Sequence, residues 1–97
     1  MNMTLTDTLK KLIAKRTITG HNAEISSAFD WVEKELAGLP LYFARHEYNG
    51  VPSLVITTQK DQKNPKLWLC AHMDVVDGSE QVWIPQEKDG RIYGRGS

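Results

Sequence analysis

The sequence predicts an α/β fold in which helices pack on a mixed β-sheet. Two segments with apolar residues at helical spacing come first, and two segments with strand character follow them. The candidate strand "LWLCAH" comes next, with an uninterrupted apolar run at residues 67–71 followed by His72. Helices and strands of one chain pack in layers around a shared core. With 97 residues, 40% of them hydrophobic and 25% charged, the composition is that of one globular unit.

The first helix is expected over about residues 5–16. Its apolar side consists of four residues at i, i+4, i+7 and i+8: Leu5, Leu9, Leu12 and Ile13. Thr4 and Asp7 have the spacing of a capping box, in which each side chain binds the backbone N–H of the other residue. These signals place the start of the helix directly after Thr4.

The second helix is expected to begin at Asn22, whose side chain suits an N-cap. Its inner face consists of five apolar residues: Ile25, Ala28, Phe29, Val32 and Leu36. Gly38 and Pro40 end the helix. The polar cluster in "WVEKELAG" then forms its solvated face.

Two hairpins are predicted from turn residues. Residues 41–58 carry β-forming side chains on both sides of Asn49-Gly50, a strong signal for a two-residue turn. Asp89-Gly90 lies between two short candidate strands near residue 97. The run at residues 67–72 has consecutive rather than alternating apolar residues, which is typical of a strand covered on both faces. Cys70, the only cysteine, is therefore expected to be buried and inert.

The charge balance excludes some functions. The sequence has twelve Lys and Arg residues and twelve Asp and Glu residues, and its net charge is zero. The basic residues are scattered along the chain, so the sequence lacks the basic stripe expected of a nucleic-acid binder. No apolar run approaches the roughly 20 residues of a membrane span, and the first sixteen residues do not resemble a secretory signal. We therefore expect a cytoplasmic protein that binds neither nucleic acid nor membrane.

His72 and Asp74 are the candidate site residues. On a strand, side chains two apart point to the same face, so this pair would project together from the end of the 67–72 strand, where ligands usually bind in open α/β sheets. Asp74 could fix the tautomer of a metal-binding His72. Alternatively, the pair could serve as base and orienter of a nucleophile, with Cys70 as the candidate thiol. Taken alone, the spacing favours a plain hydrogen-bonded histidine.

Three segments together resemble a known enzyme family. They are "LWLCAHMDVV", the "W" and "P" at Trp83 and Pro85, and "DGRIYGRGS" at residues 89–97. Their order and spacing are similar to those of the co-catalytic zinc amidohydrolases and exopeptidases that include acetylornithine deacetylase, aminoacylase, succinyl-diaminopimelate desuccinylase and glutamate carboxypeptidase. The resemblance covers the whole chain and implies the N-terminal portion of a zinc exopeptidase-like catalytic domain.

The resemblance implies specific roles. His72 matches the first zinc ligand, and Asp74 matches the aspartate at the catalytic site that orients it. The turn at residues 94–97 matches one that leads to an aspartate bridging two zinc ions. That aspartate, the paired glutamates, the further histidine ligand and a dimerisation domain are not in this sequence. Residues 1–97 are thus expected to be a piece of one catalytic domain, cut before the remaining ligands, and inactive alone.

For the intact protein, the resemblance implies amide hydrolysis by a water activated by two zinc ions. Its substrates would be N-acyl amino acids or short peptides, and the protein a homodimer. The family often has Pro where this chain has Asp77, so the adjoining loop is expected to differ. A non-catalytic α/β binding module that keeps the scaffold is the competing interpretation.

For several other residues we expect a surface or packing position rather than a functional role. His21 and His46 are expected to be solvated. Trp83 is expected to pack over a loop. Arg91 and Arg95 could meet a substrate carboxylate, but their glycine-rich turns favour ordinary surface positions.

Overall fold

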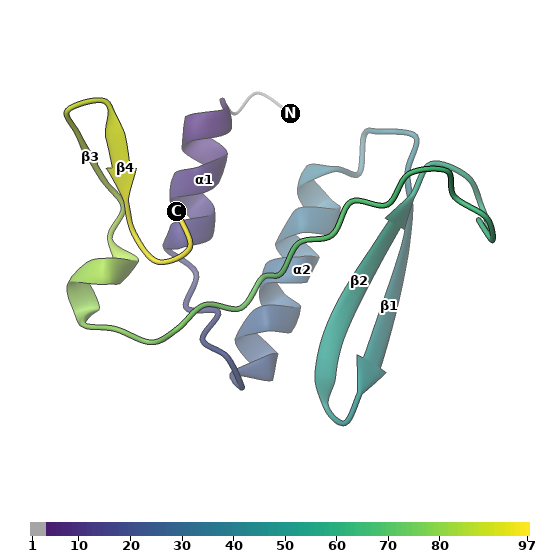
Figure 1. Ribbon diagram of the computed structural model, residues 1–97, viewed down its shortest axis with the longest axis horizontal. Coiled ribbons are helices and arrows are strands. Elements are labelled where there is room, and N and C mark those ends of the chain that lie inside the picture. The colour runs from purple at the N-terminus through teal and green to yellow at the C-terminus, as the bar shows by residue number, and fades with distance from the viewer. Residues whose placement is uncertain (1–3) are drawn as a thin grey trace.

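The computed structural model describes residues 4–97. It contains the two predicted helices and the two predicted antiparallel hairpins (Figure 1). Along the chain the elements are α1 (Leu5–Ile13), α2 (Asn22–Glu35), β1 (Tyr42–Tyr48), β2 (Val51–Thr57), the 3₁₀ helix η1 (Glu80–Trp83), β3 (Gln86–Lys88) and β4 (Arg91–Tyr93). The α/β class is therefore confirmed. The mixed sheet is wrong, because the described strands form two separate two-stranded antiparallel sheets.

The helix α1 starts as predicted and ends early. Thr4 accepts a hydrogen bond from the Asp7 N–H at 3.1 Å, and Asp7 accepts one from the Thr4 N–H at 3.4 Å, so both halves of the capping box form. The helix ends at Ile13 rather than at residue 16. The β-branched residues Thr17, Ile18 and Thr19 pair with the segment around Val75 instead of continuing the helix.

The helix α2 lies against the first hairpin. Its N-cap is His21, so Asn22 is the first helical residue and the predicted Asn22 cap is wrong by one position. Ile25 and Ala28 are buried, and the other residues of the predicted inner face are half-buried. From β1, Arg45 reaches Asp30 at 2.6 Å and Glu33 at 2.5 Å, which ties the hairpin to the helix.

Both predicted hairpins form. In the first, Tyr42 pairs with Thr57 and Tyr48 with Val51, and Asn49 and Gly50 turn the chain with φ of 51° and 81°. Such positive angles at both positions are typical of a type I′ turn, which Asn-Gly favours. In the second, Asp89 and Gly90 turn with φ of 52° and 74°. Local turn chemistry alone was enough to predict these elements.

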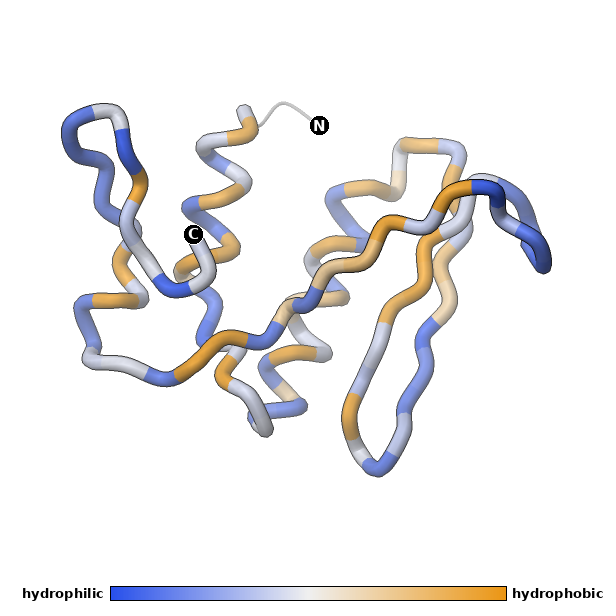
Figure 2. The backbone as a smooth tube through the Cα atoms, viewed as in Figure 1, coloured by the Kyte–Doolittle hydropathy of each residue, from blue (hydrophilic) through white to orange (hydrophobic). Residues whose placement is uncertain are grey.

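The predicted strand at residues 67–72 is wrong. The segment is extended but has no strand assignment, and Leu67, Trp68 and Leu69 are 73%, 69% and 88% exposed. Figure 2 shows it as a largely hydrophobic tube that crosses the view in front of α2. A strand needs a neighbour to satisfy its backbone groups, and no described residue pairs with this one. Cys70 is accordingly exposed, not buried.

The core is small. Its buried apolar side chains come from α1, α2 and η1: Ile13, Ile25, Ala28 and Trp83. Trp83, 5% exposed, is a packing residue as predicted. Thr17 is buried beside them at 3% exposure. Within residues 4–97, every helix is too short or too polar to span a membrane.

Candidate metal-ligand site

The residues next to His72 are fixed by a short ladder between two distant segments. Ile18 and Val75 form a parallel bridge, in which the Thr19 N–H donates to the Val75 carbonyl at 3.0 Å and the Val75 N–H donates to the Thr17 carbonyl at 2.9 Å. The buried Thr17 hydroxyl also donates to the Met73 carbonyl at 2.9 Å. The chain following His72 is therefore anchored to the turn after α1.

Asp74 is held by its side chain as well. The Thr19 hydroxyl donates to Asp74 Oδ2 at 2.7 Å, while Asp74 Oδ1 lies 3.3 Å from His72 Nδ1. The Thr19 hydrogen bond is the largest cause that lowers the pKa of Asp74 below its ordinary value, and its own backbone N–H and His72 lower it further. Asp74 is thus an ionised carboxylate that lies between a threonine hydroxyl and an imidazole.

The ring of His72 contacts Asp74 through one nitrogen. His72 Nδ1 lies 2.8 Å from the Asp74 carbonyl oxygen and 3.3 Å from its carboxylate. Both oxygens can only accept hydrogen bonds, so Nδ1 carries the proton and donates it. In the neutral ring the lone pair then resides on Nε2. The side chain is 82% exposed, so this lone pair is open to solvent.

The expected contact between the side chains of His72 and Asp74 is confirmed. The strand that was expected to bring them together does not form. The two side chains come together from an unpaired segment rather than from the end of a strand. The shorter contact uses the main chain of Asp74, not its carboxylate. Thr17 and Thr19, which position the pair, were missed. Their alternation in "RTITG" is a strand-like signal that could have indicated them.

The glycine-rich turn at residues 94–97 lies beside the same segment. Gly96 has φ of 75°, and a Cβ there would lie 2.8 Å from Val75 Cγ1. A Cβ on Gly94 would lie 2.4 Å from Ile13 Cγ2. Both positions require a residue without a side chain, because the backbone approaches a neighbour closely. Two of the three segments that carried the resemblance, residues 67–76 and 89–97, therefore meet next to Asp74.

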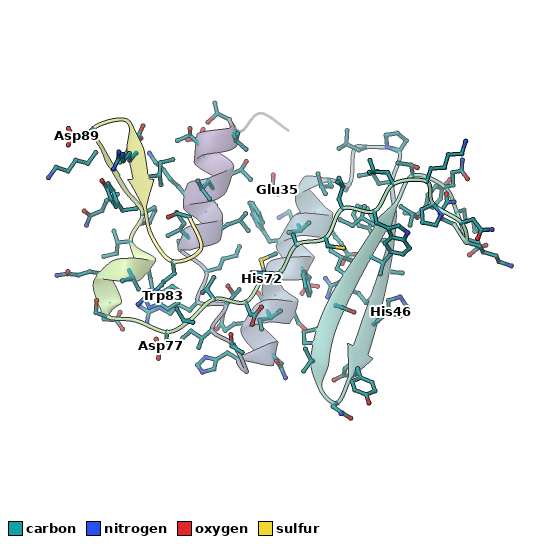
Figure 3. The ribbon with its side chains drawn as sticks, viewed as in Figure 1. Glu35, His46, His72, Asp77, Trp83 and Asp89 are labelled. Carbon is teal, nitrogen blue, oxygen red and sulfur yellow. The ribbon has the colours of Figure 1, made fainter. Side chains whose placement is uncertain are left out.

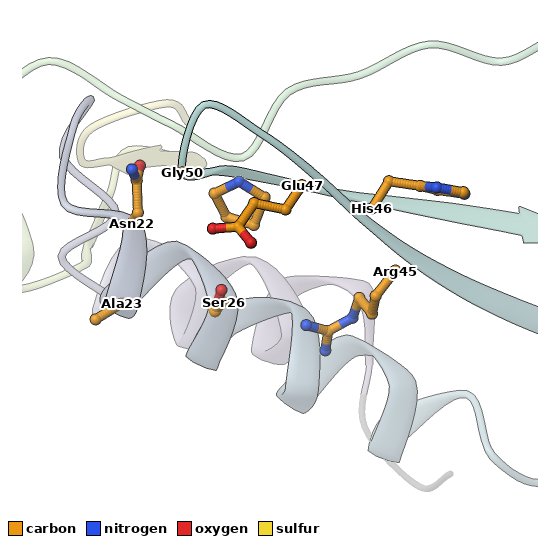
Figure 4. A pocket seen from close by; sticks show the side chains of 8 residues that line it. Asn22, Ala23, Ser26, Arg45, His46, Glu47 and Gly50 are labelled. Atoms are coloured by element: carbon orange, nitrogen blue, oxygen red, sulfur yellow. The ribbon is translucent and has the colours of Figure 1, made fainter.

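The other two histidines lie elsewhere, and Figure 3 shows His46 on the first hairpin, away from His72. His46 is exposed on β1 and His21 is exposed before α2, as predicted. His46 borders a hollow of about 400 Å³ between α2 and the first hairpin, which also takes in Asn22 and Glu47 (Figure 4). Neither His72 nor Asp74 lines that hollow.

Within residues 4–97 no three His, Cys, Asp or Glu side chains gather closely enough to hold a metal ion. His72 and Asp74 contact each other without a third side chain of these types close by. No protein-family model and no curated protein matches this chain.

Proposed function

We propose that this chain is the N-terminal part of the catalytic domain of a zinc-dependent amidohydrolase or exopeptidase. Its substrates would be N-acyl amino acids or short peptides. The observation that carries the proposal is the His72 ring, whose Nδ1–H is bound by Asp74 while Nε2 keeps its lone pair. A histidine that ligates zinc has this arrangement, with one nitrogen on the metal and the other donating to a fixed oxygen.

The donor types fit zinc at one position. Neutral imidazole is a preferred zinc ligand, and Asp74 keeps the ring in the tautomer that offers Nε2. A catalytic zinc normally takes three protein ligands, so His72 supplies one of several. We therefore expect the 97 residues alone to be inactive and to bind zinc weakly.

In this proposal the residues of the chain have limited and distinct tasks. His72 binds through Nε2, and Asp74 holds its ring and raises its basicity. Thr19 holds Asp74, and Thr17 holds the backbone before it. A zinc pair, when bound, would supply a water of lowered pKa and would polarise the scissile carbonyl.

The test uses the product of the complete reading frame. We expect it to hydrolyse N-acetyl amino acids, to lose this activity with a chelator and to regain it with zinc. His72→Ala should abolish activity, whereas His46→Ala, an exposed histidine on β1, should retain it. Asp74→Asn should lower activity by about 10–100-fold because it disturbs the orienter.

Two results would contradict the proposal. Full activity in His72→Ala would remove that residue from the metal site. Absence of any metal-dependent hydrolysis in the complete product would leave the competing interpretation, a binding module that keeps the scaffold without the reaction.

A further inference from the structure

A second hollow lies in the C-terminal part of the chain, between η1 and the second hairpin. It measures about 260 Å³ and contains neither His72 nor Asp74. Its polar lining comes from five side chains: Ser79, Gln81, Gln86, Tyr93 and Arg95. Val82 and Ile84 add apolar surface. The hollow therefore combines neutral hydrogen-bonding groups, an apolar wall and one cation.

Arg95 differs from the arginines that hold the fold together. Arg16 is paired with Glu80, and Arg45 is paired with two carboxylates of α2. Arg95 makes no ion pair with any residue of 4–97, and its buried Nε–H finds no hydrogen-bond acceptor there. A buried donor without an acceptor is costly. The expectation of an ordinary surface position for Arg95 is therefore wrong, since the residue is half-buried.

Two of the acidic groups near this hollow have ion-pair partners. Glu80, next to Ser79, binds Arg16, and Glu87, next to Gln86, binds Lys10 at 2.7 Å. Glu80 is held so closely that the Arg16 hydrogen bond lowers its pKa. Asp77, next to Gly78, accepts a hydrogen bond from the Gly78 N–H at 2.7 Å. Arg95 itself has no ion-pair partner among residues 4–97.

The guanidinium is also fixed in position. A Cβ on Gly78 would lie 2.7 Å from Arg95 Nη2 and 2.8 Å from its Nε, so the group lies against bare backbone. The Arg95 N–H donates to the Val82 carbonyl at 3.4 Å, which anchors the main chain. Because the Arg95 side chain is already restricted before binding, less conformational entropy is lost when a ligand binds.

We propose that this hollow binds the carboxylate of a small organic acid through Arg95. The planar guanidinium matches a carboxylate, and the arginine has no ion-pair partner among residues 4–97 that would compete for it. The amides of Gln81 and Gln86 and the hydroxyl of Tyr93 supply further hydrogen bonds. The apolar wall contacts the carbon chain of the ligand. This site is independent of the proposed zinc chemistry.

The test follows the ¹⁵N–¹H NMR signals of Arg95 Nε and Gly78 in the 97-residue chain during titration with propionate. Matched titrations use propanamide, chloride and inorganic phosphate. We expect saturable shifts with propionate alone. Arg95→Gln should weaken binding by about tenfold or more, since a charge-assisted hydrogen bond is lost. Arg91→Gln, which removes an exposed arginine from the same hairpin, should bind as the unmodified chain does.

The outcomes separate clearly. Equal shifts with chloride or propanamide, or equal weakening by both arginine variants, would overturn the site. Saturation by phosphate but not propionate would overturn the assignment to carboxylates. If Arg95→Gln does not fold, the ligand series on the unmodified chain and on Arg91→Gln still tests whether the hollow binds carboxylates.

Discussion

The first hairpin and the run at residues 67–72 have similar strand-forming composition but different structures. In the hairpin, the Asn49-Gly50 turn brings β2 back onto β1, and seven residue pairs form from Tyr42 with Thr57 to Tyr48 with Val51. The later run has stronger burial signals, yet Leu69 is 88% exposed. The hairpin obtains its partner from its own turn, whereas the run depends on a partner that sequence pattern cannot supply. Apolar pattern indicates a preference for burial, and pairing decides whether that preference is met.

The run is nevertheless anchored just after its end. Residues 73–75 bind the turn after α1 through both backbone and side-chain hydrogen bonds. The candidate site lies at the boundary between the unpaired and the anchored parts. We therefore expect substitutions to have distinct effects in the anchor (residues 73–75 and their partners 17–19), in the first hairpin and in the free run (residues 67–72).

The anchor should show the largest effect. Thr17→Val keeps the buried shape but leaves the Met73 carbonyl without its hydroxyl donor, so we expect a loss of about 1–3 kcal/mol in the free energy of unfolding. Thr8→Val, which removes an exposed hydroxyl bond within α1, should change it by less than about 0.5 kcal/mol. Urea unfolding measures both. Equal effects would mean that the anchor contributes no more than a surface contact.

The hairpin turn should come next. Gly50→Ala places a side chain at φ of 81°, and we expect a loss of about 1–2 kcal/mol because that conformation disfavours a Cβ. Space is not the cause, since the nearest atom, Asn22 Nδ2, would be at 3.7 Å. Gly38→Ala, with an ordinary φ and open space, is the matched control and should lose nothing. If both variants unfold at the same urea concentration, the turn does not determine the pairing.

The carboxylate at the site should produce a smaller, pH-dependent effect. The folded pKa of Asp74 lies below its unfolded value, chiefly because of the Thr19 hydroxyl. Its contribution to stability is therefore present above the unfolded pKa of about 3.9 and is lost as the pH falls through the lower folded value. Thr19→Val should raise the Asp74 pKa in an NMR titration, whereas Thr57→Val, at the end of β2, should not. An unchanged Asp74 pKa in Thr19→Val would refute the hydrogen bond.

The free run should show the smallest effect. Leu69→Ala should change the free energy of unfolding by less than about 0.5 kcal/mol, because the side chain contacts little. Ile25→Ala, in a residue that is 6% exposed, should cost about 2–4 kcal/mol. Similar losses in the two variants would mean that residues 67–72 form a buried strand in solution.

Sequence predicted the elements whose determinants are local. The capping box of Thr4 and Asp7, and the turns at Gly50 and Gly90, depend on residues within a few positions of each other. The sequence could not predict the exposure of Leu69, because that depends on what lies beside an extended segment. The α1 end was misplaced for the same reason, since it follows from pairing with a segment more than fifty residues away, around Val75.

The candidate site was predicted in part. The prediction that His72 and Asp74 meet is confirmed, although the strand on which it rested does not form. The spacing could not indicate that the Asp74 carbonyl makes the shorter contact, or that Thr19 holds the carboxylate. The position of Arg95 was missed because its surroundings combine the glycine-rich turn with Gly78, from a different loop.

In the proposed metal site, Asp74 holds the Nδ1–H of His72 and leaves Nε2 free. The most direct measurement is ¹⁵N NMR of the imidazole nitrogens in the 97-residue chain at about pH 8, where an ordinary histidine is neutral. The exposed His21 and His46 serve as internal references. We expect His72 to differ from both, with its proton on Nδ1 and the lone pair on Nε2. A proton on Nε2, or the same tautomer mixture in all three histidines, would contradict it.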